Sequence, residues 1–167
     1  LFDVFTLPMI SGNPKTALTD PHSVVITEDM AMKYFNSTDV TGKNLIIDDT
    51  SNYKITGVIK NIPEQSHFNF DFFVSMSSST ESRENNWLGN NFNTYILLRK
   101  GVDPKKLEAQ FPAMVLKYAG PQVKQLLKTS MEDFSKTGNR LSYNLMPITQ
   151  IHLHSNKVAE IGINSNI

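Results

Sequence analysis

Residues 23–35 read SVVITEDMAMKYF, and this stretch decides the kind of fold that the chain can form. Its first part is rich in β-branched residues and predicts a buried strand. Thr27 then suits the cap of a helix, because Glu28 and Asp29 follow at the positive end of the helix dipole. The apolar residues of this helix recur at three- and four-residue spacing, which predicts one buried face: Met30, Ala31, Tyr34 and Phe35. A strand that runs directly into a helix favours a domain with both element types.

Segments on both sides of this stretch predict further strands. Residues 43–47 and 53–60 flank a polar turn and predict a hairpin, because both are rich in β-branched and aromatic residues. The alternation in residues 2–6 predicts an N-terminal strand, which ends at the turn-forming residues 11–14.

Three later segments complete the predicted strands. Residues 66–72 alternate strictly, and this period of two predicts one apolar face, made of Phe68, Phe70 and Phe72. We expect helices to cover that face, which is a commoner fate for such a face than ligand binding. Residues 94–100 predict a central strand, and residues 141–146 predict a last strand that resumes after Pro147 through 151–154.

Proline and glycine divide the predicted helices. Asp103 suits a helix cap with Pro104 behind it, Pro112 must kink or restart that helix, and Gly120-Pro121 separates a second one. The order of elements predicts an α+β fold with a mixed or largely antiparallel sheet and three or so helices. The polar loop 76–93 could divide the chain into subdomains 1–75 and 94–167.

Composition excludes several classes of protein. The 167 residues contain 16 Lys and Arg and 16 Asp and Glu, so the formal net charge is zero, and we expect no nucleic-acid partner. The absence of cysteine excludes thiol catalysis, disulfides and Cys-ligated zinc. No apolar run reaches the length of a membrane span. The chain opens abruptly on the apolar Leu1 and Phe2, so we expect it to be a segment of a larger protein.

The sequence shows no catalytic constellation. Neither a G-x-S-x-G elbow nor a phosphate-binding glycine motif occurs, so we expect no catalytic residue and no cofactor. His152 and His154 are weak metal candidates, because residues two apart on a strand share a face. A third ligand would have to come from His67, Asp71 or Glu160. We expect the two histidines to be ordinary strand residues and no metal to bind.

Two positions have predicted structural roles. Gly57 lies in mid-strand, where glycine costs stability unless another segment packs close to it, and we expect such a close approach. Trp87 lies in the polar loop 76–93, and we expect it to fold back and staple this loop to the sheet. Loops of this length are often functional, so we expect the residues around Trp87 to face a partner: Glu84, Asn85, Asn86, Asn90 and Asn91.

Several segments resemble one known family closely. The chain is similar to the extracytoplasmic core domain of ABC transporter permeases of the FtsX/MacB type, particularly the version common in Bacteroidetes. The combination of Thr56-Gly57-Val58-Ile59 with Ser66-His67 and Phe70-Asp71-Phe72 is specific, and the likeness covers nearly the whole chain. Other matching segments are Phe2-Asp3-Val4-Phe5, Gly12-Asn13-Pro14, Ser23-Val24-Val25-Ile26-Thr27, Tyr34-Phe35, Gly42-Lys43, Thr94-Tyr95 and Pro147 to His154. The chain departs from the family's pattern at Asn36, Val40 and Thr41.

The resemblance implies a non-catalytic domain in the periplasm of a Gram-negative bacterium, over residues 1–167. Such a domain belongs to a permease in the cytoplasmic membrane, and a separate ATPase drives it. The implied partners are the cytoplasmic ATPase subunit, a second permease copy and a periplasmic partner or substrate protein. The implied role is to transmit ATPase-driven motion in efflux, lipoprotein transport or another cell-envelope task.

Two other classes of protein stay open at this point. A stand-alone periplasmic module that binds a ligand or peptide would show a well-formed apolar pocket. A secreted hydrolase would show a carboxylate or histidine with a strongly perturbed pKa in a cleft.

Overall fold

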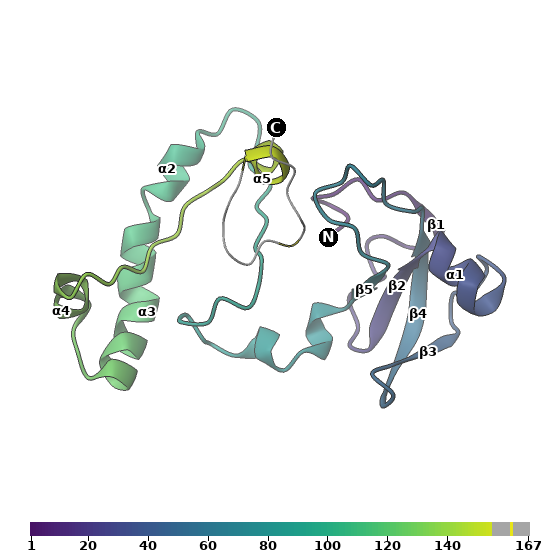
Figure 1. The fold of residues 1–167 in the computed structure, drawn as a ribbon, viewed down its shortest axis with the longest axis horizontal. Helices are drawn as coiled ribbons and strands as arrows, with labels where there is room; N and C mark the ends of the chain where they lie inside the picture. The colour runs from purple at the N-terminus through teal and green to yellow at the C-terminus, as the bar shows by residue number, and fades with distance from the viewer. Residues whose placement is uncertain (155–160, 162–167) are drawn as a thin grey trace. The chain divides into compact units, whose positions relative to one another are not determined.

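A computed structural model describes residues 1–154 and residue 161 of the chain. These residues form two compact units (Figure 1). The first unit comprises Leu1–Glu84 together with Ile151–Ile167, and the second comprises Asn85–Gln150. The boundary between them falls inside the polar loop 76–93.

The first unit is built on a mixed five-stranded sheet. Its strands are β1 (Met9–Gly12), β2 (Ser23–Thr27), β3 (Asn44–Ile47), β4 (Ser51–Ile59) and β5 (Phe72–Val74). They run in the order β1-β4-β2-β5, and β3 pairs with the first half of β4. Only β2 and β4 are parallel, because helix α1 lies between them in the chain. The α+β fold with a mixed sheet is confirmed.

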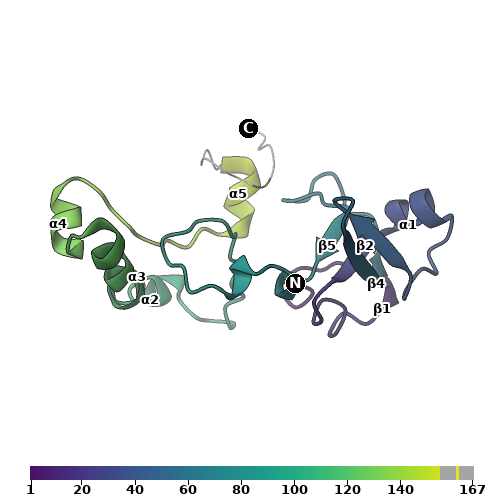
Figure 2. The ribbon, with the colours of Figure 1, turned by 90° about the horizontal axis from the view of Figure 1, so that it is seen from below.

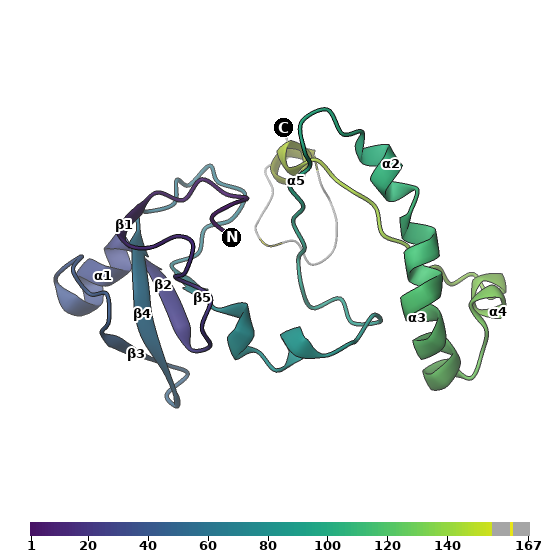
Figure 3. The same cartoon turned by 180° about the vertical axis from the view of Figure 1, so that it is seen from behind.

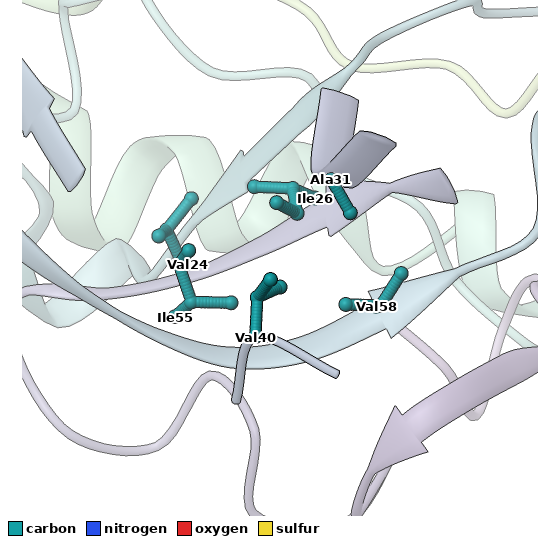
Figure 4. Close-up of a cluster of buried hydrophobic side chains, with 6 residues drawn as sticks. All are labelled: Val24, Ile26, Ala31, Val40, Ile55 and Val58. Atoms are coloured by element: carbon teal, nitrogen blue, oxygen red, sulfur yellow. The ribbon is translucent and has the colours of Figure 1, made fainter. Parts of the chain in front are cut away.

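Helix α1 (Glu28–Phe35) covers one face of the sheet (Figure 2). The Thr27 hydroxyl accepts the amide of Met30 at its start, as the capping pattern predicts. Figure 4 shows the six fully buried side chains between helix and sheet: Val24, Ile26, Ala31, Val40, Ile55 and Val58. Of the predicted helix face, Met30 and Phe35 pack against this cluster. Tyr34 is 53% exposed, and its ring is tilted against that of Phe72 with 6.4 Å between centroids.

A second apolar cluster covers the other face of the sheet. Val25 and Ile59 point into it from β2 and β4, and Ala17, Ile62 and Phe68 complete it from the loops. Partly buried residues of the N-terminal segment close it: Phe2, Phe5, Leu7 and Met9. The sheet is therefore packed on both faces, which explains why β2 is buried along its whole length.

Two predicted strands of this unit are wrong in extent. Residues 2–6 form a turn, in which the amides of Val4 and Phe5 both bond to the Leu1 carbonyl, and the edge strand is β1 instead. Residues 66–71 form no strand, and β5 begins only at Phe72. The reason is that β2 leaves the sheet at Thr27, so residues before Asp71 have no strand to pair with.

The second unit is built on one long helix (Figure 3). Side-chain hydrogen bonds join extended segments before and after it to the helices of this unit. Its helices are α2 (Pro104–Glu108), α3 (Phe111–Leu127) and α4 (Met131–Lys136), and α5 (Ile148–His154) begins in it. Asp103 caps α2, and the chain restarts as α3 at Phe111 with Pro112 in its first turn, as predicted. Two short 3-10 helices, Met76–Ser78 and Glu81–Arg83, precede this unit.

The predicted break at Gly120-Pro121 is wrong, because α3 continues through both residues. Its buried residues lie four apart on both sides of Pro121: Phe111, Val115, Ala119 and Val123. Burial of this continuous stripe outweighs the hydrogen bond that a proline removes from a helix.

The predicted strands of the second unit are also wrong. Residues 94–100 and 141–146 are extended but belong to no strand. A strand needs a neighbour for its ladder, and no described segment of this unit provides one. Residues 151–154 belong to helix α5 rather than to a strand, because a short apolar run has no period of its own and the preceding Pro147 suits a helix start.

Candidate functional site

The loop that contains Trp87 is held by helix α3. The indole ring of Trp87 stacks on the ring of Tyr118 with 4.7 Å between centroids and 10° between planes. Trp87 is half-buried, and Tyr118 is half-exposed. The ring therefore staples the loop to α3 and not, as the sequence suggested, to the sheet. No local pattern indicates Tyr118 as the partner, because it lies 31 residues further along the chain.

Gln122 of α3 clamps the same loop through its side-chain amide. Its Oε1 accepts the backbone amide of Trp87 at 2.9 Å, and its Nε2 donates to the carbonyl of Asn85 at 2.5 Å. From the other extended segment, the hydroxyl of Tyr143 donates to the carbonyl of Trp87 at 3.3 Å. Side chains thus satisfy backbone groups that a neighbouring strand would otherwise satisfy. Sequence analysis did not find either residue.

Two of the predicted partner-facing asparagines are engaged within the loop. The Oδ1 of Asn85 accepts the indole N–H of Trp87 at 2.7 Å, which fixes the plane of the ring. The Oδ1 of Asn86 accepts the amides of Leu88 and Gly89, each at 3.0 Å, and forms a tight turn. Their side-chain oxygens therefore shape the loop.

All five predicted partner-facing residues are exposed, including Glu84, Asn90 and Asn91. Glu84 ends the first unit, whereas Asn90 and Asn91 lie beyond the turn that Asn86 makes. Exposed residues of this set thus lie on both sides of the turn, at Glu84 and at Asn90.

Gly57 lies where strands β4 and β1 approach each other closely. A Cβ at this position would lie 3.1 Å from the Ser11 carbonyl oxygen and 3.1 Å from the Met9 Cε. Gly12 is paired directly with it, and a Cβ there would lie 2.8 Å from the Gly57 Cα. The φ of Gly12 is +99°, which side chains disfavour. Two paired glycines thus allow β1 and β4 to lie close together, with the Met9 side chain over Gly57.

The phenylalanine stripe does not form one face. Phe68 is buried in the second cluster, where its ring stacks on Phe70 at 5.7 Å between centroids. Phe72 packs against the first cluster, on the opposite face of the sheet. The strand begins only at Phe72, so the residues before it do not alternate between the two faces of a sheet. The three phenylalanines therefore do not share a face.

The histidine pair is not arranged as predicted. His152 and His154 lie in helix α5, where positions two apart fall on opposite sides of the axis rather than on a common face. Their side chains, and Glu160, lie outside the described residues. Of the other proposed ligands, Asp71 accepts the Thr27 hydroxyl at 3.2 Å, and the His67 ring packs edge-on against Phe68. Within the described part of the chain, no group of three His, Asp or Glu residues could hold a metal ion.

One titratable group in the second unit has a shifted pKa. Burial raises the pKa of the Tyr95 phenol above its ordinary value. Tyr95 belongs to the extended segment 94–98, in which it is half-buried while Ile96 and Leu97 are exposed. The shift follows from desolvation alone and indicates packing rather than chemistry.

Comparison with known proteins identifies the class. The model of the MacB-like periplasmic core domain family matches residues 1–114, which is more than half of the chain. The chain therefore belongs to the MacB-like periplasmic core domain family. None of the described helices is both long and apolar enough to cross a membrane.

Two solved structures are similar to the chain. One is a domain of a putative permease from Porphyromonas gingivalis, with 28% identity and a TM-score of 0.58 over 70% of this chain and 55% of that one. The other is the periplasmic region of MacB from Actinobacillus actinomycetemcomitans, with 15% identity and a TM-score of 0.43 over 84% of this chain and 63% of that one. The chain thus spans less than two thirds of either structure. A comparison with curated proteins finds no match.

Proposed function

We propose that this chain is the non-catalytic extracytoplasmic domain through which an ABC transporter permease transmits ATPase-driven motion to periplasmic substrates or partner proteins. The match to the MacB-like periplasmic core domain family over residues 1–114 carries this proposal. The implied setting is the cytoplasmic membrane of a Gram-negative bacterium, with this domain in the periplasm. The implied partners are the cognate ATPase subunit, a second permease copy and a periplasmic protein.

The loop around Trp87 is the proposed contact for the periplasmic protein. Stacking on Tyr118 and the Gln122 clamp hold the turn at the surface of α3, and Glu84 and Asn90 lie exposed beside it. An exposed loop fixed to a rigid element is a common way to present binding residues. Efflux, lipoprotein transport and other envelope tasks all fit this arrangement.

The test uses the full-length permease together with its ATPase in the native host. We expect Glu84→Lys combined with Asn90→Lys to abolish the export phenotype while membrane insertion and ATP hydrolysis are retained, since only the partner contact is changed. Glu64→Lys combined with Asn69→Lys, the same two residue changes at exposed positions of the first unit, is the matched control and should leave export intact. Export that needs no ATP hydrolysis would refute the role in transmission. Normal export by the loop variant would refute the proposed contact.

A further inference from the structure

Strand β5 forms one edge of the sheet in the first unit (Figure 1). It pairs antiparallel with β2 on its inner side, where Val74 lies opposite Val24 and Phe72 lies opposite Ile26. The order of strands ends at β5, so no described strand lies on its outer side. An edge strand of this kind can accept a further strand through its free backbone groups.

The ladder with β2 shows which backbone groups of β5 point outward. The Ser75 amide donates to the Ser23 carbonyl at 2.9 Å, so this residue pair is hydrogen-bonded. Bonded and non-bonded pairs alternate in an antiparallel ladder, so Phe73 also bonds to β2, whereas Phe72 and Val74 direct their amides and carbonyls away from it. Within the described part of the chain, no hydrogen bond joins these outward groups to another segment.

The other edges of the sheet carry features that oppose the addition of a strand. Strand β1 follows Pro8 and contains a register shift, and β3 lies between the charged residues Lys43 and Asp48. Bulges, prolines and charges are the usual means by which proteins block an edge strand. Residues 72–76, with the sequence FFVSM, contain neither proline nor charge. The edge at β5 is therefore the one that its sequence leaves open.

Exposed apolar side chains flank this edge on both faces of the sheet. On the face covered by α1, Val74 is 40% exposed, and the half-exposed ring of Tyr34 lies 6.4 Å from that of Phe72. On the other face, Phe70 is 43% exposed, and its ring lies 6.3 Å from that of Phe73. A strand added to β5 would remove apolar surface from water on both faces.

We propose that an extended, apolar segment of a periplasmic partner or substrate protein adds to the outer side of β5 as a further strand of the sheet. An extended backbone offers the donors and acceptors that the outward groups of Phe72 and Val74 need. Because apolar side chains flank the edge on both faces, the added segment should be apolar at successive positions. The inference rests on the proposed function only for the presence of such a protein, and its contact is separate from the loop around Trp87.

Other occupants match this edge less well. A small apolar ligand or a lipid chain would cover the exposed rings, but it would leave the outward amides and carbonyls desolvated and without partners, which is costly. A second copy of the chain would pair its own β5 here. The experiment separates that case, because self-pairing needs no added peptide.

The test follows amide hydrogen exchange of the chain by NMR while a peptide is added. The probe is an acetylated and amidated peptide with the sequence Lys-Val-Thr-Val-Ile-Val-Lys, in which the terminal lysines maintain solubility. We expect saturable binding that slows exchange of the Phe72 and Val74 amides at least about tenfold, whereas the Phe73 amide, already bonded to β2, changes less than about twofold. The same peptide methylated on three consecutive central amides cannot donate from either of its edges. It should leave the exchange of all three residues unchanged.

A proline at position 74 removes one outward donor without removing a bond to β2. Val74→Pro should raise the dissociation constant of the peptide at least about tenfold, because a peptide carbonyl loses its partner. Val74→Thr keeps the amide and the β-branched shape, and it should change this constant less than about threefold. Slow exchange of the Phe73 amide in both variants checks that β5 still pairs with β2.

A second variant tests the apolar cover and leaves the backbone of β5 unchanged. Tyr34→Ala should raise the dissociation constant about fivefold, because the exposed ring no longer covers the added strand. Met32→Ala is the matched control, since Met32 is also exposed on α1 but lies on the opposite side of the helix. It should change the constant less than about twofold.

Four results would refute the contact. They are unchanged exchange at every peptide concentration, equal binding of the methylated peptide, and protection of Phe72 and Val74 that rises with chain concentration in the absence of peptide, which would assign the edge to a second copy. The fourth is protection of residues 72–74 without peptide in the full-length permease, measured by hydrogen-exchange mass spectrometry, which would assign the edge to another segment of the permease. None of these measurements depends on ATP-driven export, so the proposed function fails or succeeds separately.

Discussion

The two units reach order by different means. In the first unit, five strands share ladder hydrogen bonds, and β2 is buried along its whole length between two apolar clusters. In the second unit, one helical stripe is buried, and the extended segments on either side are held by bonds from Gln122, Tyr143 and Glu108 to single backbone groups. Such isolated bonds contribute about 1 kcal/mol each, without the cooperativity of a ladder.

This contrast indicates where stability is concentrated. Units with few buried apolar contacts and exposed backbone bonds open at lower free energy than closed cores. The second unit should therefore open first, and the sheet of the first unit should persist. This difference suits a domain in which the second unit binds partners while the first unit keeps its folded structure.

The largest expected effect is in the core of the first unit. Ile26→Ala should lower the free energy of unfolding by about 2–5 kcal/mol, because it leaves a cavity in a fully buried cluster. Ile46→Ala at an exposed position of the same unit should change it by less than about 0.5 kcal/mol. Urea denaturation followed by circular dichroism measures both. Equal effects would show that the first unit has no dominant core.

The close pairing of β1 with β4 at Gly57 should be the next most sensitive feature. Gly57→Val should lower the free energy of unfolding by about 1–3 kcal/mol, since its side chain meets the Ser11 carbonyl and the Met9 side chain. Gly120→Ala in the second unit is the control, because the atom nearest to its added Cβ is in the Met131 side chain, at an ordinary contact distance of 3.5 Å. A neutral or stabilising Gly57→Val would show that the strands can separate at no cost.

Trp87 fluorescence reports on the second unit alone, because this residue is the only tryptophan and lies in that unit. It therefore allows the stabilities of the two units to be compared. Its emission should change at lower urea concentration than hydrogen exchange of the Val25 amide in β2. A double-mutant cycle of Trp87→Leu and Tyr118→Leu should give a coupling of about 0.5–1.5 kcal/mol for the stacked rings. The pair of Trp87 with Phe134 on α4 is the control and should show no coupling. If Trp87 emission and Val25 amide exchange changed at the same urea concentration, the two units would not differ in stability.

The smallest effects should come from the two helix ends with left-handed caps. Lys128 ends α3 with φ of 54°, and Asn36 ends α1 with φ of 52°. Lys128→Gly should stabilise the chain by about 0.4–1 kcal/mol, because lysine tolerates this conformation poorly. Asn36→Gly should gain only a few tenths, since asparagine already suits the position. Thermal melts at low protein concentration measure both. A destabilising Lys128→Gly would show that this end is held by other contacts.

Sequence reasoning succeeded where structure follows from neighbours in the chain. The Thr27 cap with its acidic first turn, the hairpin of β3 and β4, and the restart of the helix at Pro112 all depend on interactions within about four residues. The loop around Trp87 was also recognisable from composition alone, because polar residues surround one large aromatic. Its internal bonds were not, since Gln122 and Tyr143 lie 35 and 56 residues away.

Tertiary structure decided which candidate segments became strands and which residues share a face. Residues 66–71 and 94–100 have strand-like patterns, but a strand forms only beside a partner, and β2 ends at Thr27 while the second unit has no described strand. For the same reason Phe68 and Phe72 lie on opposite faces of the sheet. The sequence by itself therefore determined the family, the local caps and the turns. Only the packed chain determined the pairing partners, the continuity of α3 through Pro121 and the ring on which Trp87 stacks, because these depend on contacts between residues far apart in sequence.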